Sequence, residues 1–186
     1  RPSGVIENEI LKSLDIGAHA IQVPNIESTD QINDLIKFSK YPPIGNRGFS
    51  PFTRSSNYSI DNASIIMKEA NKNTLIGINV EGQKGIENIE SFAEFDEIDM
   101  FFIGIYDITK FVGEPGNIKS PEVMKLLKKL TTFLRDKNKA VGTIAIDESS
   151  LKIYLDLGIN YILYWVDSAV LQNSYKKVVN AFEKIK

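Results

Sequence analysis

Short apolar segments alternate with helical patterns along this chain, and this alternation limits the available folds more than any other feature. Several of the apolar segments are rich in β-branched or aromatic residues; they are Ala20–Pro24, Leu75–Val80, Met100–Gly104, Ala140–Ile146 and Tyr161–Val166. Such runs are typical of buried strands in a parallel sheet. Because helical patterns separate them, the sequence predicts an α/β fold.

Helix start signals indicate that the segments between these strands are helices. Ser120 and Pro121 are residue types favoured at the N-cap and the first helical position, and the apolar residues after them recur every three or four positions. Ser28 and Gln31 have the spacing of a capping box. We therefore expect helices to begin beside Ser28 and Ser120.

A helix end, a glycine and a strand occur together twice. The sequences LDIGAHAIQVP and LDLGINYILYW place Gly17 and Gly158 at the C-cap. This return from helix to strand is found in parallel barrels and in open doubly wound sheets. A closed (β/α)8 barrel has eight strands and typically about 250 residues. Residues 1–186 are therefore predicted to form one domain, either an open sheet or a (β/α)8 barrel whose first two to three strands precede Arg1.

Composition excludes several classes of function. The net charge is -2 with both signs spread along the chain, so we expect neither nucleic acid nor an anionic membrane as a partner. The absence of cysteine removes disulfides, thiolate metal sites and cysteine nucleophiles, and it is typical of a cytoplasmic protein. No apolar run approaches the roughly 20 residues of a membrane span.

Two acidic residues follow neighbouring strands of the expected sheet. Glu81 closes the segment INVE, and Asp107 follows FFIGIY. Ligands of α/β folds bind at the carboxyl ends of parallel strands. Two carboxylates without nearby His or Cys favour Mg2+ or Mn2+, with water completing the coordination, although the pair would also serve as an acid/base couple. The structural alternative is that each acid caps a helix or pairs with Lys84 or Lys110.

Four segments carry a family resemblance that covers nearly the whole chain in order. Lys40–Gly48 (KYPPIGNRG), Ile78–Thr109, Val112–Val123 and the YLDLG segment resemble the HpcH/HpaI aldolases, relatives of the citrate lyase β subunit. The resemblance implies a (β/α)8 barrel of the phosphoenolpyruvate/pyruvate class. It also implies a homo-oligomer, usually a hexamer with a swapped C-terminal helix. The implied activity is divalent-metal-dependent retro-aldol cleavage of 2-keto-4-hydroxy acids to pyruvate and an aldehyde.

By that resemblance, Glu81 and Asp107 match the metal ligands, and Arg1 matches the arginine that stabilises the pyruvate enolate. Cleavage next to a ketone leaves an enolate, whose oxyanion a chelated cation stabilises by several kcal/mol. Arg1 would add a fixed positive donor where this charge develops. The physical chemistry therefore agrees with the implied roles.

Four further residues are candidates for substrate binding. Asn79 lies two residues before Glu81, on the same face of the strand, where the family commonly has Gln. The backbone at Gly104, Ile105 and Tyr106 would bind the substrate carboxylate, although the family usually has Pro-Ala at the last two positions. We expect Tyr106 to narrow the site.

The family's general base is a histidine in a Gly-Glu-His-Ala type loop, and no segment of this chain matches that loop. His19 is the only histidine; it precedes a strand, at the edge opposite the expected site, and is predicted to be a connector. Asp15 matches an acidic family position, for which we expect a local structural use. Two roles are open for Arg47 and Arg54: each either binds a substrate carboxylate or orders the loop in which it lies. For Arg47 we favour loop ordering. Asp167 is predicted to cap the last helix.

The leading function from sequence is thus a class II, Mg2+- or Mn2+-dependent pyruvate aldolase. One alternative is a non-catalytic barrel that binds a keto acid or serves assembly, because Asn79, Ile105 and Tyr106 depart from the family pattern and the histidine loop is absent. A second alternative is a citrate-lyase-like acyl-CoA lyase, which shares the metal acids. The sequence does not indicate the aldehyde.

Overall fold

The computed structural model describes residues 1–60 and 62–185. Five strands form one sheet in the order β1-β2-β3-β4-β5, with every neighbouring pair parallel. The strands are β1 Ala20–Val23, β2 Leu75–Val80, β3 Met100–Ile103, β4 Ala140–Ala145 and β5 Tyr161–Tyr164. This confirms the α/β fold. Because the strand order never reverses, the sheet is wound in one direction, as in a barrel, and is not doubly wound.

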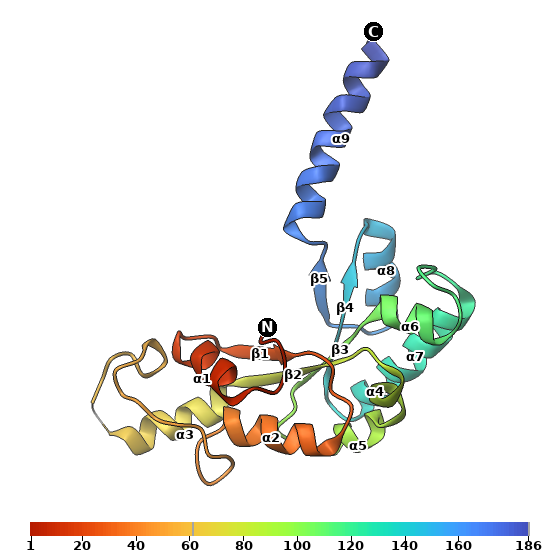
Figure 1. Ribbon diagram of the computed structural model, residues 1–186. Coiled ribbons are helices and arrows are strands. Elements are labelled where there is room, and N and C mark those ends of the chain that lie inside the picture. The colour runs from red at the N-terminus through yellow and green to blue at the C-terminus, as the bar shows by residue number, and fades with distance from the viewer. Residues whose placement is uncertain (61, 186) are drawn as a thin grey trace.

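Helices lie before, between and after the strands, and all but the last, α9, cover one face of the sheet (Figure 1). They are α1 Glu7–Asp15, α2 Thr29–Ser39, α3 Ala63–Asn73, α4 Gln83–Glu87, α5 Ile89–Ala93, α6 Ile105–Phe111, α7 Pro121–Asp136, α8 Glu148–Asp156 and α9 Asp167–Ile185, with a 3-10 turn η1 at Arg54–Ser56. α1 packs on β1, and α7 and α8 pack on β4. Within the described ranges, no helix is both long and apolar enough to cross a membrane.

The local start and stop signals act as the sequence predicted. Ser28 forms a complete capping box with Gln31, and the Ser120 side chain accepts the Val123 N–H. Gly17 and Gly158 have φ of +94° and +88°, the left-handed conformation that ends a helix most easily at glycine.

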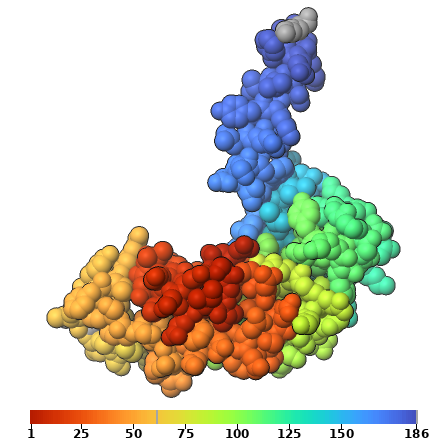
Figure 2. Space-filling model, viewed as in Figure 1, coloured from red at the N-terminus to blue at the C-terminus, as the bar shows by residue number. Residues whose placement is uncertain are grey.

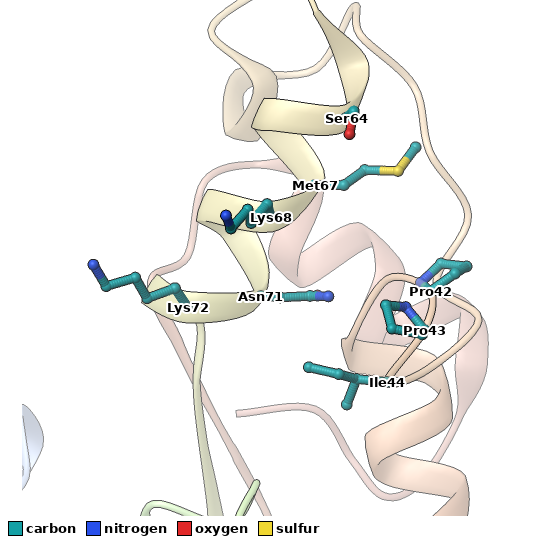
Figure 3. A pocket seen from close by; sticks show the side chains of 8 residues that line it. All are labelled: Pro42, Pro43, Ile44, Ser64, Met67, Lys68, Asn71 and Lys72. Carbon is teal, nitrogen blue, oxygen red and sulfur yellow. The ribbon is translucent and has the colours of Figure 1, made fainter.

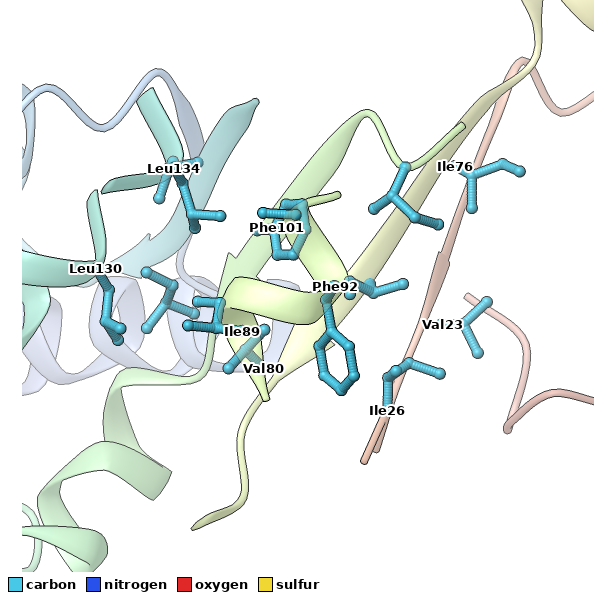
Figure 4. Packing of buried hydrophobic residues seen from close by; sticks show 14 of the residues in the cluster. Val23, Ile26, Ile76, Val80, Ile89, Phe92, Phe101, Leu130 and Leu134 are labelled. Atoms are coloured by element: carbon cyan, nitrogen blue, oxygen red, sulfur yellow. The ribbon is translucent and has the colours of Figure 1, made fainter. Parts of the chain in front are cut away.

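Alternate strand residues form the core between the sheet and its helices (Figure 4). On this helix-covered face the side chains are apolar and almost fully buried, among them Ile21, Val23, Ile76, Ile78, Val80, Phe101, Ile103 and Val141. Each strand points its other residues to the opposite, inner face. That face carries polar residues, glycines and aromatic rings beside aliphatic side chains such as Leu75 and Leu163.

The prediction of buried strands is correct for most of β2, β3 and β4 but wrong for β5, whose residues are half-buried or exposed. Some residues of the inner face are exposed. Leu75 of β2 is 41% exposed and Leu163 of β5 is 38% exposed, both on this face. The sheet nevertheless curves around the inner face, because the Tyr161 hydroxyl of β5 donates to the Gln22 side chain of β1, at the opposite edge. The described chain is therefore a parallel half-barrel.

The last helix, α9, projects away from the rest of the molecule (Figures 1 and 2). None of its residues is buried, and its apolar side chains include Tyr175 at 66% exposure and Val178 at 68%. Asp167 is the first residue of α9, and its carboxylate accepts the N–H of Ser168. Asp167 is therefore not the N-cap that the sequence predicted; the carbonyl of Val166, one residue earlier, accepts the N–H groups of Ala169 and Val170.

Candidate active site

Two carboxylates meet at the edge where the parallel strands end. Glu81 directly follows β2, and Asp107 lies in the first turn of α6, just after β3. A Cβ placed on Gly104 would lie 2.8 Å from Glu81 Cβ and 3.3 Å from Asp107 Oδ2. Both acidic side chains therefore pack against the bare Cα of Gly104, and the structure brings together the two acids that the sequence singled out.

The Glu81 carboxylate is held at both oxygens. The backbone N–H of Asn25 donates to Oε1 at 2.9 Å, and Asn79 Nδ2 donates to Oε2 at 3.3 Å. Asn25 follows β1 in the left-handed conformation, with φ of +56°, which places its N–H beside the end of β2. An ionised carboxylate oxygen accepts two hydrogen bonds, so each oxygen keeps a free lone pair for a cation.

The sequence left open that Lys84 or Lys110 pairs with the two acids. Neither lysine forms a strong ion pair with Glu81 or Asp107. Lys84 pairs with Glu27 at 3.5 Å, rather than with Glu81. Lys110 lies 3.4 Å from Asp107 Oδ1, but the two side chains are 72% and 40% exposed. Exposed pairs of this kind contribute about 0–1 kcal/mol. Lys110 can therefore leave Asp107 at little cost.

The chemistry of this donor set fits Mg2+ or Mn2+. Both ions prefer carboxylate oxygens, and Mg2+ commonly takes one or two carboxylates while water and substrate fill its other positions. In the part of the chain that the structure describes, no cluster of three or more His, Cys, Asp or Glu side chains could hold a metal. Glu81 and Asp107 would thus be the two protein ligands, and they leave open positions for a chelating substrate.

The turn after β3 presents backbone donors beside these acids. Gly104 precedes α6, so the N–H groups of Ile105 and Tyr106 lie in the first helical turn, where no intrahelical acceptor exists. The Tyr106 side chain is 43% exposed. Burial, and secondarily Tyr106, raises the pKa of nearby Tyr154 to about 12, so that phenol stays protonated at neutral pH and is unsuited as a base.

The structure does not bring Arg1 or His19 into contact with the acids. Within the described ranges, the exposed Arg1 side chain forms no hydrogen bond or ion pair. His19 is exposed and directly precedes β1, whereas Glu81 follows the far end of β2, which runs parallel to β1. His19 therefore lies at the opposite edge of the sheet, as the sequence predicted.

Arg47 has the loop-ordering role that the sequence favoured. Its side chain is buried, and Nη2 donates to Asp15 Oδ1 at 2.7 Å and to Ser55 Oγ at 3.3 Å. The guanidinium also lies 4.8 Å from the centre of the Tyr41 ring. These contacts join the end of α1 to the loop after α2, which explains the acid at position 15. Arg54 lies over Gly17 instead.

The KYPPIGNRG segment, Lys40–Gly48, is likewise structural. Lys40 is buried and donates to the carbonyls of Asn71 at 2.9 Å and Thr74 at 2.6 Å, and burial lowers its pKa. A Cβ at Gly45 would overlap the Lys40 carbonyl. This segment therefore fastens α2 to the end of α3 and does not reach the acids.

One cavity, of about 760 Å3, lies away from the acids (Figure 3). The Pro42–Ile44 turn faces α3 across it, and the α3 side chains on its wall are Ser64, Met67, Lys68, Asn71 and Lys72. It contains no acid and no strand-end residue. This cavity therefore does not coincide with the pair of acids.

Sequence reasoning missed two polar residues of the inner face. Gln22 Nε2 donates to Asn79 Oδ1 at 2.7 Å, and the Tyr161 hydroxyl donates to Gln22 Oε1 at 3.0 Å. Asn79, the candidate substrate-binding residue, is thus bonded on both sides within the protein. Gln22 is the one amide in the apolar segment AIQVP, and this interruption was the signal available in the sequence.

Comparison with known proteins identifies the family. The sequence model of HpcH/HpaI aldolase/citrate lyase matches residues 2–174. The chain belongs to the HpcH/HpaI aldolase/citrate lyase family. A hydroxypyruvate/pyruvate aldolase of Pseudomonas aeruginosa is 30% identical over 94% of this chain and 65% of its own length. A 5-keto-4-deoxy-D-glucarate aldolase of Klebsiella pneumoniae is 29% identical over 94% of this chain and 68% of its own length.

The fold agrees with this family assignment. The crystal structure of an HpcH/HpaI aldolase from Desulfitobacterium hafniense superimposes with a TM-score of 0.89 at 23% identity. The match covers 97% of this chain and 70% of that one. This HpcH/HpaI chain thus spans about two thirds of the length of the curated relatives it matches, 65% for the first and 68% for the second.

Proposed function

We propose that the protein is a divalent-metal-dependent carbon–carbon lyase that cleaves a 2-keto-4-hydroxy acid to pyruvate and an aldehyde. The observation that carries the proposal is the meeting of Glu81 and Asp107 over Gly104 at the carboxyl edge of the sheet. Family membership supports it, because relatives named for aldolase activity on keto acids match 94% to 95% of the chain.

Glu81 and Asp107 would hold Mg2+ or Mn2+. When bound, the cation polarises the keto group of the substrate and stabilises negative charge on that oxygen. The two acids leave several coordination positions open, which suits a substrate that binds through both its keto oxygen and its carboxylate. The N–H groups of Ile105 and Tyr106 would donate to that carboxylate, at the point where Gly104 allows close approach.

The reaction removes a proton from the 4-hydroxyl group. The bond between carbons 3 and 4 then breaks, the hydroxyl-bearing carbon becomes the aldehyde, and the bonding electrons pass into the enolate of pyruvate. Protonation of carbon 3 completes pyruvate. Arg1 would donate hydrogen bonds to the oxygen on which the enolate charge develops, and such a fixed donor stabilises the transition state more than the ground state.

General-base assistance commonly contributes about 100- to 10,000-fold. The only histidine, His19, lies at the other edge of the sheet. We therefore propose that cleavage by the whole protein uses a histidine loop not contained in these 186 residues. For this segment alone, we expect at most weak enolisation of pyruvate. A protein without such a base would bind keto acids without cleaving them.

The test is exchange of the pyruvate methyl protons in deuterated water, followed by NMR with and without Mn2+. Exchange reports enolisation, which requires the cation and Arg1 but not cleavage. We expect Mn2+-dependent exchange that Glu81→Ala abolishes together with Mn2+ binding. The matched control is Glu90→Ala, because Glu90 is an exposed glutamate on α5.

Arg1→Ala should slow exchange at least tenfold while Mn2+ affinity stays nearly unchanged, because the guanidinium acts on the substrate oxygen and not on the cation. Exchange that needs no Mn2+, or that is indifferent to Arg1, would overturn the aldolase proposal. Exchange by the whole protein without cleavage of any 2-keto-4-hydroxy acid would favour the binding function.

We also propose that the half-barrel is part of a closed (β/α)8 barrel within a homo-oligomer, a hexamer in the family pattern. The exposed Leu75 and Leu163 on the inner face would be covered by further strands. The apolar side chains of α9 would pack on another copy, since an apolar stripe of this size rarely stays in water. Light scattering that finds a stable, cooperatively melting monomer of these 186 residues would contradict this.

A further inference from the structure

A continuous chain of hydrogen bonds crosses the inner face of the half-barrel and ends at Glu81. The Tyr161 hydroxyl donates to Gln22 Oε1 at 3.0 Å, and Gln22 Nε2 donates to Asn79 Oδ1 at 2.7 Å. Asn79 Nδ2 then donates to Glu81 Oε2 at 3.3 Å. Three residues from β5, β1 and β2 thus form one relay, although the first and second are 139 positions apart.

The chemistry of the groups fixes the direction of this relay. An ionised carboxylate only accepts hydrogen bonds, so the NH2 group of Asn79 must face Glu81. The Asn79 oxygen then faces Gln22 and requires a donor there, which turns the Gln22 oxygen toward β5. The Tyr161 hydroxyl supplies the donor that this oxygen needs. A flip of either amide would place two acceptors against each other.

The sheet makes room for this relay. Gly142 of β4 is paired with Tyr161, and a Cβ at Gly142 would overlap the Tyr161 ring. The ring of Phe102 meets the same ring edge to face, with 6.0 Å between centroids. Asn79 is 2% exposed, so its amide has little access to water and depends on its protein partners. The ring and both amides are therefore fixed in position.

We propose that Tyr161, Gln22 and Asn79 are positioning residues that fix the Glu81 carboxylate for cation binding. Asn79 holds Oε2, Gln22 prevents the Asn79 amide from turning, and Tyr161 prevents the Gln22 amide from turning. The Asn25 N–H binds the other oxygen of Glu81, Oε1. Because both oxygens are held, the Glu81 carboxylate is restricted to one orientation at the end of β2. The inference rests on the proposed metal role of Glu81, and it adds that residues remote from the cation set its affinity.

The test measures Mn2+ affinity of the full-length protein by calorimetry. Outer hydrogen-bond partners of metal ligands typically contribute 10- to 100-fold in affinity. We expect Asn79→Leu to weaken binding at least tenfold, and Tyr161→Phe and Gln22→Met to weaken it about three- to tenfold. The matched control is Tyr164→Phe, the same change on the same strand but on the other face, where Tyr164 is 56% exposed.

A melting curve of each variant separates positioning from simple structural support. In the relay variants, Mn2+ affinity should fall in samples that still fold, whereas Tyr164→Phe leaves affinity unchanged. If the wild type binds Mn2+ and Tyr161→Phe and Gln22→Met bind it equally well, the relay is refuted while the metal site stands. If the wild type binds no Mn2+, the metal role of Glu81 fails and the relay falls with it.

Discussion

The two faces of the sheet are built from alternate residues of the same strands, yet they differ in almost every property. On the helix-covered face, Ile78 and Phe101 are completely buried among apolar side chains. On the inner face, their sequence neighbours Asn79 and Phe102 contact Gln22 and Tyr161. The comparison teaches that one face provides the stability of the fold, whereas the other holds polar groups in place at a stability cost.

The largest effect should come from damage to the helix-covered face. Phe101→Ala removes a fully buried ring and leaves a cavity, so we expect a loss of about 3–5 kcal/mol in the free energy of unfolding. Leu163→Ala, on the inner face at 38% exposure, should cost about 1 kcal/mol or less. Denaturant unfolding measures the free energy of unfolding of both variants. Equal losses would show that the two faces contribute equally to the stability of the fold.

A smaller effect on stability but a clear effect on the site is expected at Gly104. In Gly104→Ala the new Cβ would lie 2.8 Å from Glu81 Cβ, so the carboxylate must move. Mn2+ affinity should fall at least tenfold, which is the loss commonly seen when a residue that orients a metal ligand is removed. Gly4→Ala is the control for a new methyl group, since nothing lies within 4 Å of that position and its backbone is not in the left-handed conformation. Calorimetry showing the same affinity in both would contradict the placement of Glu81.

The smallest effect concerns the start of α8, which belongs to the helical layer. The Ser150 N–H, followed by the hydroxyls of Ser150 and Ser149, lowers the pKa of Asp147 to about 2. Because the folded pKa is below the ordinary 3.8, the cap contributes fully above that value and is lost as pH falls toward 2. Carboxyl NMR should show a midpoint near 2, and Asp147→Asn should leave Mn2+ affinity at pH 7 unchanged. A midpoint at or above 3.8 would show that the cap does not form.

Much of the fold was predictable because its signals are local. Apolar segments, capping residues at Ser28 and Ser120, and glycines at positions 17 and 158 act through backbone neighbours, and the structure confirms them. The expectation of a buried strand was wrong only for β5, because an apolar run does not reveal which of its residues another layer covers. The single winding direction of the sheet also required the strand order.

The candidate site was predictable only in part. Glu81 and Asp107 could be found because an acid that ends an apolar strand is visible in sequence, and parallel strands end at one edge. Their common packing against Gly104 was not visible, since it depends on how β2 and β3 pair. The roles of Arg1 and of the Ile105 and Tyr106 backbone remain predictions.

By itself, the sequence determined the strand and helix segments, their start and stop residues, and the two acids at neighbouring strand ends, because each depends on neighbours along the chain. Only the tertiary structure decided that Arg47 binds Asp15 and that Tyr161 reaches Glu81 through Gln22 and Asn79. Those partners are brought together by the curvature and register of the sheet. Curvature and register arise from the packing of all the strands together, and no short segment of the sequence specifies them.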